Sequence, residues 1–263
     1  MPNDELNPKN DRWRWETCDE VDSTNRVAQE RVLTHWGQGA SADGVVIVSR
    51  RQTAGRGQHG RRWESPEGGL YMSVVIEDVP AELRARLALV VGMAVIEAVH
   101  ETCPMEQEAG VLQIRWPNDV LLGGRKLAGV LCQALAQGER WATIIGIGIN
   151  VNTSIHALPE SVRDEAASIA GATGRAWEVE PLARRCASAV GHWMEMTGVF
   201  GIAGLVQCIA RVDALKGNGV RMESDMRVVD GVGAGLRDDG ALLLKKEDGS
   251  VEAFERGSIL PPV

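Results

Sequence analysis

The chain has 263 residues, of which 44% are hydrophobic and 24% charged, and its formal net charge is −8. Such values are ordinary for a globular protein with room for one domain and a small appendage. They exclude a bilayer-spanning chain, because no apolar run reaches the required length, and they disfavour general nucleic-acid binding, whose affinity depends on neutralising phosphates.

The N-terminus and the cysteines indicate a cytoplasmic protein. Residues 1–12 are polar, carry Pro2 and Pro8, and lack the apolar core of a secretory signal, so we expect a flexible tail. The five cysteines are scattered and never form a CxxC pair. This argues for reduced thiols and against a disulfide framework or a zinc ribbon.

In the first part of the chain, a helix precedes two strands that flank a basic loop. Residues 22–25 are rich in N-cap types and predict a helix over 23–35. Apolar runs predict strands over 45–48 and 70–76. Residues 51–63 between them hold three glycines, four arginines and no acidic residue. Glycine amides and guanidinium groups attract anions, so this loop predicts an anionic substrate.

The rest of the chain predicts an α+β fold in two parts. Further elements are expected as helices over 81–101, 181–197 and 205–212, and as strands over 112–116, 126–136 and 141–150. After residue 213, short apolar runs alternate with Asp-Asp-Gly and Glu-Asp-Gly turns, which is typical of antiparallel hairpins. We therefore predict a mixed α/β domain over 13–212 and a small all-β domain over 213–263.

Three stretches place glycines beside polar or cationic side chains at the ends of predicted strands, where ligand-contacting groups stand exposed on a rigid scaffold. They are the basic loop, residues 115–119 with 123–129, and residues 146–152. Together they supply arginines, a lysine, an acid able to hold Mg²⁺ and asparagines able to read a purine or amide edge. Taken singly, Lys126 is better explained as a surface lysine, Asn118-Asp119 as a polar turn, and Trp63 and Trp116 as core tryptophans. The glycines of the basic loop, by contrast, argue against a plain solvated face there.

In order and separation, these motifs resemble those of the biotin–protein ligases, which activate biotin with ATP and attach it to a lysine of a carboxylase carrier domain. The matching stretches are Ser23-Thr24-Asn25, residues 52–57, Gly60-Arg61 with Trp63, residues 116–119, residues 125–129 and Gly148-Ile149-Asn150. The resemblance implies a class II synthetase-like catalytic domain, built on a mixed β-sheet packed with helices, and a small SH3-like C-terminal β-barrel.

The resemblance assigns one group of residues to biotin. The ureido head of biotin carries donors and a carbonyl acceptor that need matched partners when buried, and Ser23, Thr24 and Gln52 can supply them. Leu131 would cover the apolar part of the ligand. The full set implied for biotin is Ser23, Thr24, Asn25, Gln52, Gly55, Arg56, Gly57, Gln58, Lys126, Gly129 and Leu131.

A second group would bind ATP and the adenylate, with Lys126 as the catalytic cation. A carboxylate that attacks the α-phosphorus brings two negative groups together, and a lysine between them neutralises both. Arg56 would assist, while Asp119 would hold Mg²⁺, contact the nucleotide or accept the proton of the incoming amine. The full set implied for the nucleotide is Arg56, Arg61, Trp63, Asn118, Asp119, Lys126 and Asn150.

The implied partners are biotin, Mg-ATP and a biotin carboxyl carrier domain, with no membrane contact, and a homodimer stays open. Gln58 stands where the family commonly has an arginine, and Arg115 replaces a lysine. We hypothesise that the lost cation at position 58 loosens the hold on the adenylate. Only 22 residues precede Ser23, too few for the winged-helix domain of some members, so a monofunctional ligase that does not bind DNA is expected.

Three other functions compete with this one. Lipoate and octanoate ligases or transferases share the fold, but the polar set at Ser23, Thr24 and Gln52 favours a ureido head over an aliphatic chain. A non-catalytic biotin- or nucleotide-binding regulator would have little use for Lys126. A nucleic-acid-binding module could use the basic loop, yet the loop has no interleaved aromatics and the chain is acidic.

Overall fold

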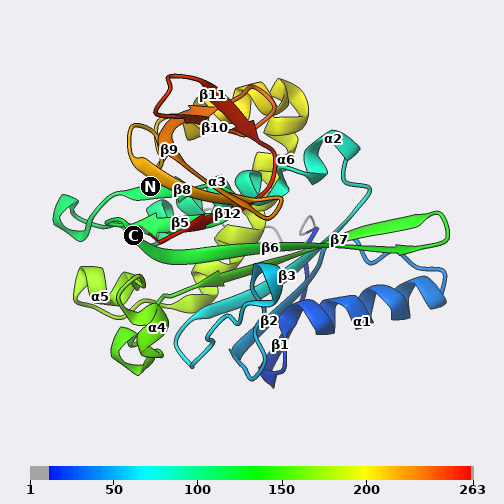
Figure 1. Cartoon of the computed structure of the whole chain (residues 1–263). Helices are drawn as coiled ribbons and strands as arrows, with labels where there is room; N and C mark the ends of the chain where they lie inside the picture. The colour runs from blue at the N-terminus through cyan, green and yellow to red at the C-terminus, as the bar shows by residue number, and fades with distance from the viewer. Residues whose placement is uncertain (1–11, 262–263) are drawn as a thin grey trace, which may run out of the picture.

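The computed structural model describes residues 12–261, so the expected tail over 1–12 lies almost entirely outside the described residues. A seven-stranded mixed sheet forms the centre of the molecule (Figure 1), in the order β1-β2-β3-β7-β6-β5-β4. Only β1 and β2 pair in parallel among these strands. The strands are β1 (Arg14–Val21), β2 (Val45–Gln52), β3 (Leu70–Glu77), β4 (Leu112–Arg115), β5 (Asp119–Leu122), β6 (Arg125–Gln137) and β7 (Arg140–Ile149).

Helices cover both faces of this sheet. One face packs against α1 (Thr24–Gly37) through a small core that includes Val32 and Trp36. The other face packs against α3 (Leu87–Thr102) and α6 (Val179–Ile209), and α6 bends at Gly201, where φ is 70°. The short elements are α2 (Ala81–Arg84), α4 (Glu160–Arg163) and α5 (Ile169–Thr173), with 3₁₀ turns at Gln58–Gly60, Gln107–Ala109 and Ile155–Ala157.

A second sheet, entirely antiparallel, follows α6 and has the order β11-β10-β9-β8-β12. Both predicted hairpin turns are present, because Gly240 and Gly249 adopt the positive φ angles that such turns need. The strands are β8 (Gly219–Ser224), β9 (Arg227–Leu236), β10 (Leu242–Lys245), β11 (Val251–Phe254) and β12 (Ser258–Leu260). The expectation of an α+β fold with a mixed sheet and a separate antiparallel sheet is therefore confirmed.

The two sheets share one hydrophobic core. Met222, Leu242 and Leu244 of the smaller sheet belong to the same buried cluster as Leu87 and Val90 of α3. Burial of such side chains is worth about 1.5–3 kcal/mol each, so the smaller sheet is held by the common core rather than merely tethered by the chain. Among the described residues, no helix is both long and apolar enough to cross a membrane.

Several element boundaries differ from the sequence expectation. β1 was not predicted, because its charged residues give little apolar signal and it pairs only with β2 at the sheet edge. The chain also turns back after Pro117 to form β5, which pairs with β4. The helix expected over 81–101 is interrupted at residues 85–86, and the two helices expected after residue 181 are parts of α6.

Candidate functional site

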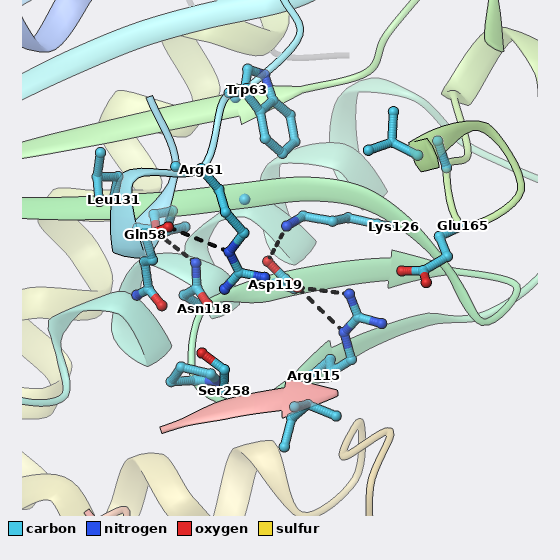
Figure 2. Close-up of a pocket in the computed structure, with 18 of the residues that line it drawn as sticks. Gln58, Arg61, Trp63, Arg115, Asn118, Asp119, Lys126, Leu131, Glu165 and Ser258 are labelled. Atoms are coloured by element: carbon cyan, nitrogen blue, oxygen red, sulfur yellow. Dashed lines mark hydrogen bonds and ion pairs between the residues drawn. The ribbon is translucent and has the colours of Figure 1, made fainter. Parts of the chain in front are cut away.

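One cavity of about 880 Å³ brings the motifs together (Figure 2). Every residue predicted for biotin or the nucleotide lines it, with the exception of Gly55. These predicted residues lie at the start of α1, at the end of β2, in the basic loop, in the β4–β5 connection and β5, in β6 and after β7. Ser23 and Asn150, which are far apart in the sequence, thus line the same cavity.

The start of α1 contributes a buried polar group to the cavity. Ser23, within the stretch 22–25 that predicted the start of the helix, is the N-cap residue, but its side chain makes no capping hydrogen bond. Thr24 donates to Gln52 Oε1 twice, from its amide (2.8 Å) and from its hydroxyl (3.2 Å). Gln52 Nε2 in turn donates to Ser65 Oγ (2.9 Å). Because the Ser23 hydroxyl does not cap the helix and lines the cavity, it is available to a ligand.

Asn25 has a different environment from its two neighbours. Its Nδ2 donates to Gln133 Oε1 (2.7 Å) and its Oδ1 accepts from Ser73 Oγ (2.6 Å). A Cβ at Gly146 would lie 2.4 Å from the same Oδ1. The amide of Asn25 therefore ties α1 to β3 and β6, and it shapes the cavity wall through these bonds.

The basic loop folds back on itself as a short hairpin. Trp63 N donates to Gly55 O (3.0 Å) and Gly57 N donates to Arg61 O (2.7 Å). Gly55 is buried inside this hairpin, and an added Cβ there would lie 2.5 Å from Trp63 O. In this conformation the Gly57 amide is therefore used within the loop, and Gly55 does not line the cavity. Arg56 and Arg61 present the cations instead.

Trp63 lies flat on a glycine pair in the sheet. Gly129 of β6 and Gly148 of β7 face each other in register, and an added Cβ would lie 2.9 Å and 2.6 Å from the indole, respectively. Only glycine allows such a close approach of an aromatic ring. The Lys126 ammonium lies 5.3 Å from the ring centroid, within the range of a cation–π contact.

Lys126 points into the cavity and pairs with Asp119 (Figure 2). The Lys126 Nζ to Asp119 Oδ1 distance is 2.7 Å, and Arg115 Nη2 lies 2.9 Å from Asp119 Oδ2. The Asp119 side chain is only 12% exposed, so both ion pairs are partly screened from water. Asp119 consequently holds two cations at the wall of the cavity.

The two predicted asparagines are fixed by the backbone around them. Asn118 Nδ2 donates to Val130 O (2.9 Å), and Val130 N donates to Asn118 O (3.0 Å). Asn150 is buried, and its backbone bridges Leu127 and Ile169. Asn118 thus joins the β4–β5 turn to β6, while Asn150 directly follows β7 and lines the cavity.

Two groups of lining residues were not predicted from the sequence. The first comes from the segment around α4 and the second from the smaller sheet, and they comprise Leu158, Ser161, Val162, Glu165 and Ala166, then Gly219, Val220, Arg221, Asp230, Gly231, Ser258, Ile259 and Leu260. The segment around α4 lacks apolar periodicity. No local pattern could reveal that the smaller sheet reaches the cavity, because only tertiary packing brings it there.

The described residues form no cluster of three or more His, Cys, Asp or Glu side chains that could hold a metal ion. Asp119 offers one carboxylate, and both of its oxygens already face a cation. Magnesium usually binds through one or two carboxylates together with substrate phosphates. The chain therefore fits a metal that arrives on a nucleotide better than a resident one.

Comparison with known proteins agrees with the motifs. The model of the biotin/lipoate A/B protein ligase family matches residues 18–150. A biotin--[acetyl-CoA-carboxylase] ligase of Paracoccus denitrificans is 31% identical over 202 residues, which are 76% of this chain and 83% of that protein. A biotin protein ligase from Aquifex aeolicus, solved in complex with biotin and ATP, has a TM-score of 0.79 and 28% identity and is similar over 94% of this chain and 97% of its own.

The chain belongs to the biotin/lipoate A/B protein ligase family, because the family model covers about half of it and the Paracoccus ligase matches most of its length. The bifunctional ligase/repressor BirA of Bacillus subtilis is also 35% identical over 159 residues. That match covers 59% of this chain and 46% of the relative, so the chain spans about half the length of this curated relative.

Proposed function

We propose that this chain is an ATP-dependent biotin–protein ligase. Biotin carboxylate attacks the α-phosphate of Mg-ATP to give biotinyl-5′-AMP and diphosphate, and a lysine amine of a carboxylase carrier domain then displaces AMP. The observation that carries the proposal is one cavity lined by Lys126, by the polar set Ser23, Thr24 and Gln52, and by arginines of the basic loop.

The biotin half of the cavity would be the part built by α1, β2 and β6. Ser23, Thr24 and Gln52 offer the hydroxyl and amide groups that a buried ureido ring requires. Leu131 and the face of Trp63 offer apolar surface for the rest of biotin. A lipoate or octanoate chain would leave the polar set without partners, which favours biotin within this family.

The nucleotide half would lie toward the β4–β5 turn and α4. Arg56 and Arg61 would contact phosphates, and Lys126 would neutralise the charge that builds between the carboxylate and the α-phosphate. Magnesium would enter on the phosphates of ATP, where it would neutralise their charge. Asn118 and Asn150 would contact the nucleoside, and Val162 would cover it from the α4 side.

Asp119 would act first by holding Lys126 in place. When the acceptor lysine arrives, the carboxylate would be near enough to the same site to take its proton. The division into a catalytic domain over 13–212 and a small SH3-like barrel over 213–263 belongs to the same proposal. So do a cytoplasmic location and a carboxylase carrier domain as the acceptor.

The test measures diphosphate release from ATP and biotin by the wild type and by Lys126→Ala. The substitution should lower the rate of adenylate formation by about 10²–10³-fold, as for other groups that stabilise transition-state charge. Arg125→Ala is the matched control, because Arg125 is exposed and does not line the cavity. A wild-type rate in Lys126→Ala would show that another group is the catalytic cation.

A further inference from the structure

Arg86 is a buried arginine between α2 and α3, and its side chain reaches into the smaller sheet. The residue is only 7% exposed. Its Nε donates to Asp239 O (2.6 Å), and its Nη1 donates to Glu255 O (3.1 Å). A buried guanidinium is costly unless its donors find partners, and here backbone carbonyls of another part of the chain supply them.

The two carbonyls lie at two different places in the smaller sheet. Asp239 belongs to the turn between β9 and β10, and Glu255 belongs to the connection between β11 and β12. The turn is shaped for the arginine, because Gly240 has a φ of +81° and an added Cβ there would lie 2.8 Å from Arg86 Cδ. Arg86 thus holds the sheet at two points.

A second buried side chain, that of Trp116, binds the same turn from the side of the cavity. Trp116 Nε1 donates to Gly240 O (3.2 Å), and Trp116 precedes the Pro117-Asn118-Asp119 segment that lines the cavity. The turn is therefore fixed between α3 and the segment that carries Asp119. Strands β8 and β12, which contribute Arg221 and Ser258 to the cavity, belong to the sheet that this turn anchors.

We propose that Arg86 is a positioning residue, one that sets the smaller sheet as a wall of the catalytic cavity. The inference rests on the proposed function and goes beyond it, because Arg86 does not line the cavity and acts through the β9–β10 turn. Ser258 of this wall lines the same cavity as Asn118 and Asp119 (Figure 2). The biotin side of the cavity is built from α1, β2 and β6 instead.

This division predicts which substrate depends on Arg86. Loss of one charge-assisted hydrogen bond is worth about a tenfold change in an equilibrium. Arg86→Gln should therefore raise the KM for ATP by about tenfold, while the Kd for biotin alone stays within about twofold, as expected for a distant site. Arg86→Lys keeps the charge and can reach one carbonyl, so it should recover part of the loss.

The experiment compares biotin affinity by calorimetry with the KM for ATP in diphosphate release, for the wild type, Arg86→Gln and Arg86→Lys. Arg84→Gln is the matched control, because Arg84 is exposed and donates to Val79 O (2.9 Å) away from the smaller sheet. An unchanged KM for ATP in both Arg86 variants would overturn the proposal. Equal losses for ATP and biotin would also overturn it, because they would indicate general unfolding.

Hydrogen exchange separates this proposal from the proposed function. In Arg86→Lys, and in Arg86→Gln if it folds, amides of β8 and β12 should exchange faster, while those of β2 and β3 should not. Unchanged exchange in β8 and β12 would overturn the positioning role even if the wild type formed no adenylate. Absence of adenylate in the wild type would instead contradict the proposed function.

Discussion

At the scale of single residues, several polar side chains that line the cavity already interact with a neighbouring side chain. Lys126 is held by Asp119, and Thr24 is held by Gln52. Ser23 differs from them, because it occupies the N-cap position of α1 without capping the helix. An unused hydroxyl at a buried position is costly unless a ligand or water pairs with it, which makes Ser23 the clearest test of the biotin end.

Ser23→Ala should weaken biotin binding without destabilising the protein. A capping serine would cost about 1 kcal/mol when replaced by alanine, whereas loss of one ligand hydrogen bond should raise the Kd for biotin by about tenfold. Calorimetry and thermal unfolding measure the two effects. Ser168→Ala is the control, since Ser168 caps α5 by accepting from Gly171 N (3.2 Å), and it should lower the Tm and leave biotin affinity unchanged.

Gln58→Arg should slow the release of biotinyl-5′-AMP. Gln58 lines the cavity, and a guanidinium there could form a charge-assisted contact with the adenylate phosphate, worth about tenfold in the dissociation rate. His59→Arg is a matched control, because His59 is next in the chain, exposed and outside the cavity lining. Equal dissociation rates of the adenylate from the wild type and Gln58→Arg would contradict the hypothesis.

At the scale of elements, the pairing of β6 with β7 creates the seat for Trp63. Two glycines in register, Gly129 and Gly148, leave a flat area on the sheet that an indole can cover. The glycines of both motifs are visible in the sequence. Their alignment with each other is not, because register depends on the length of the hairpin between them.

Gly148→Ala should displace Trp63 from this seat. The added methyl would lie 2.6 Å from the indole, and overpacking of this kind costs about 1–3 kcal/mol. The kcat/KM for adenylate formation should fall by at least about tenfold. Gly37→Ala is the control, since nothing lies within 4 Å of its added Cβ; an active Gly148→Ala enzyme would show that the position of Trp63 is unimportant.

Sequence patterns predicted elements best where burial imposes a strong period. The strands β6 and β7 and the core of α3 were predicted almost to their ends, because their apolar residues face a packed interior. β1 is a charged edge strand whose conformation depends on β2, and it was missed. The motif residues were found because glycine, lysine and carboxylate types recur beside strand ends, but their hydrogen bonds to one another required the structure.

At the scale of the whole molecule, the junction between the sheets contains an acidic side chain in an unfavourable place. Asp213 Oδ1 accepts from Leu215 N (2.8 Å), but its buried Oδ2 has no partner among the described residues. Burial raises the pKa of the Asp213 carboxyl above its usual 3.8. The native state therefore keeps this proton more readily than the unfolded chain.

This shift predicts a pH-dependent gain in stability from Asp213→Asn. Because the folded pKa is the higher one, the aspartate costs stability as the pH rises from 3.8 through the raised pKa, and the cost is complete above it. The variant should unfold at a Tm roughly 2–4 °C higher at pH 7.5, and the gain should vanish near pH 3. A gain of equal size at both pH values would contradict this account.

The position of the smaller sheet in the molecule could not be predicted from the sequence. Its turns and antiparallel strands followed from the Asp-Gly patterns, but its place in the cavity wall did not. That place depends on contacts such as Arg86 with Asp239 O, which join residues 153 positions apart. The same distance in sequence explains why Arg221 and Ser258 were absent from the predicted site.

A single-turnover chase follows both steps of the proposed biotin transfer in one experiment. The protein is mixed with biotin and labelled ATP without acceptor, and a carboxylase carrier domain is added once diphosphate release has stopped. We expect biotinyl-5′-AMP to accumulate first and the carrier then to gain biotin on one lysine as AMP is released. Failure to form the adenylate, or consumption of lipoate or octanoate in preference to biotin under competition, would contradict it.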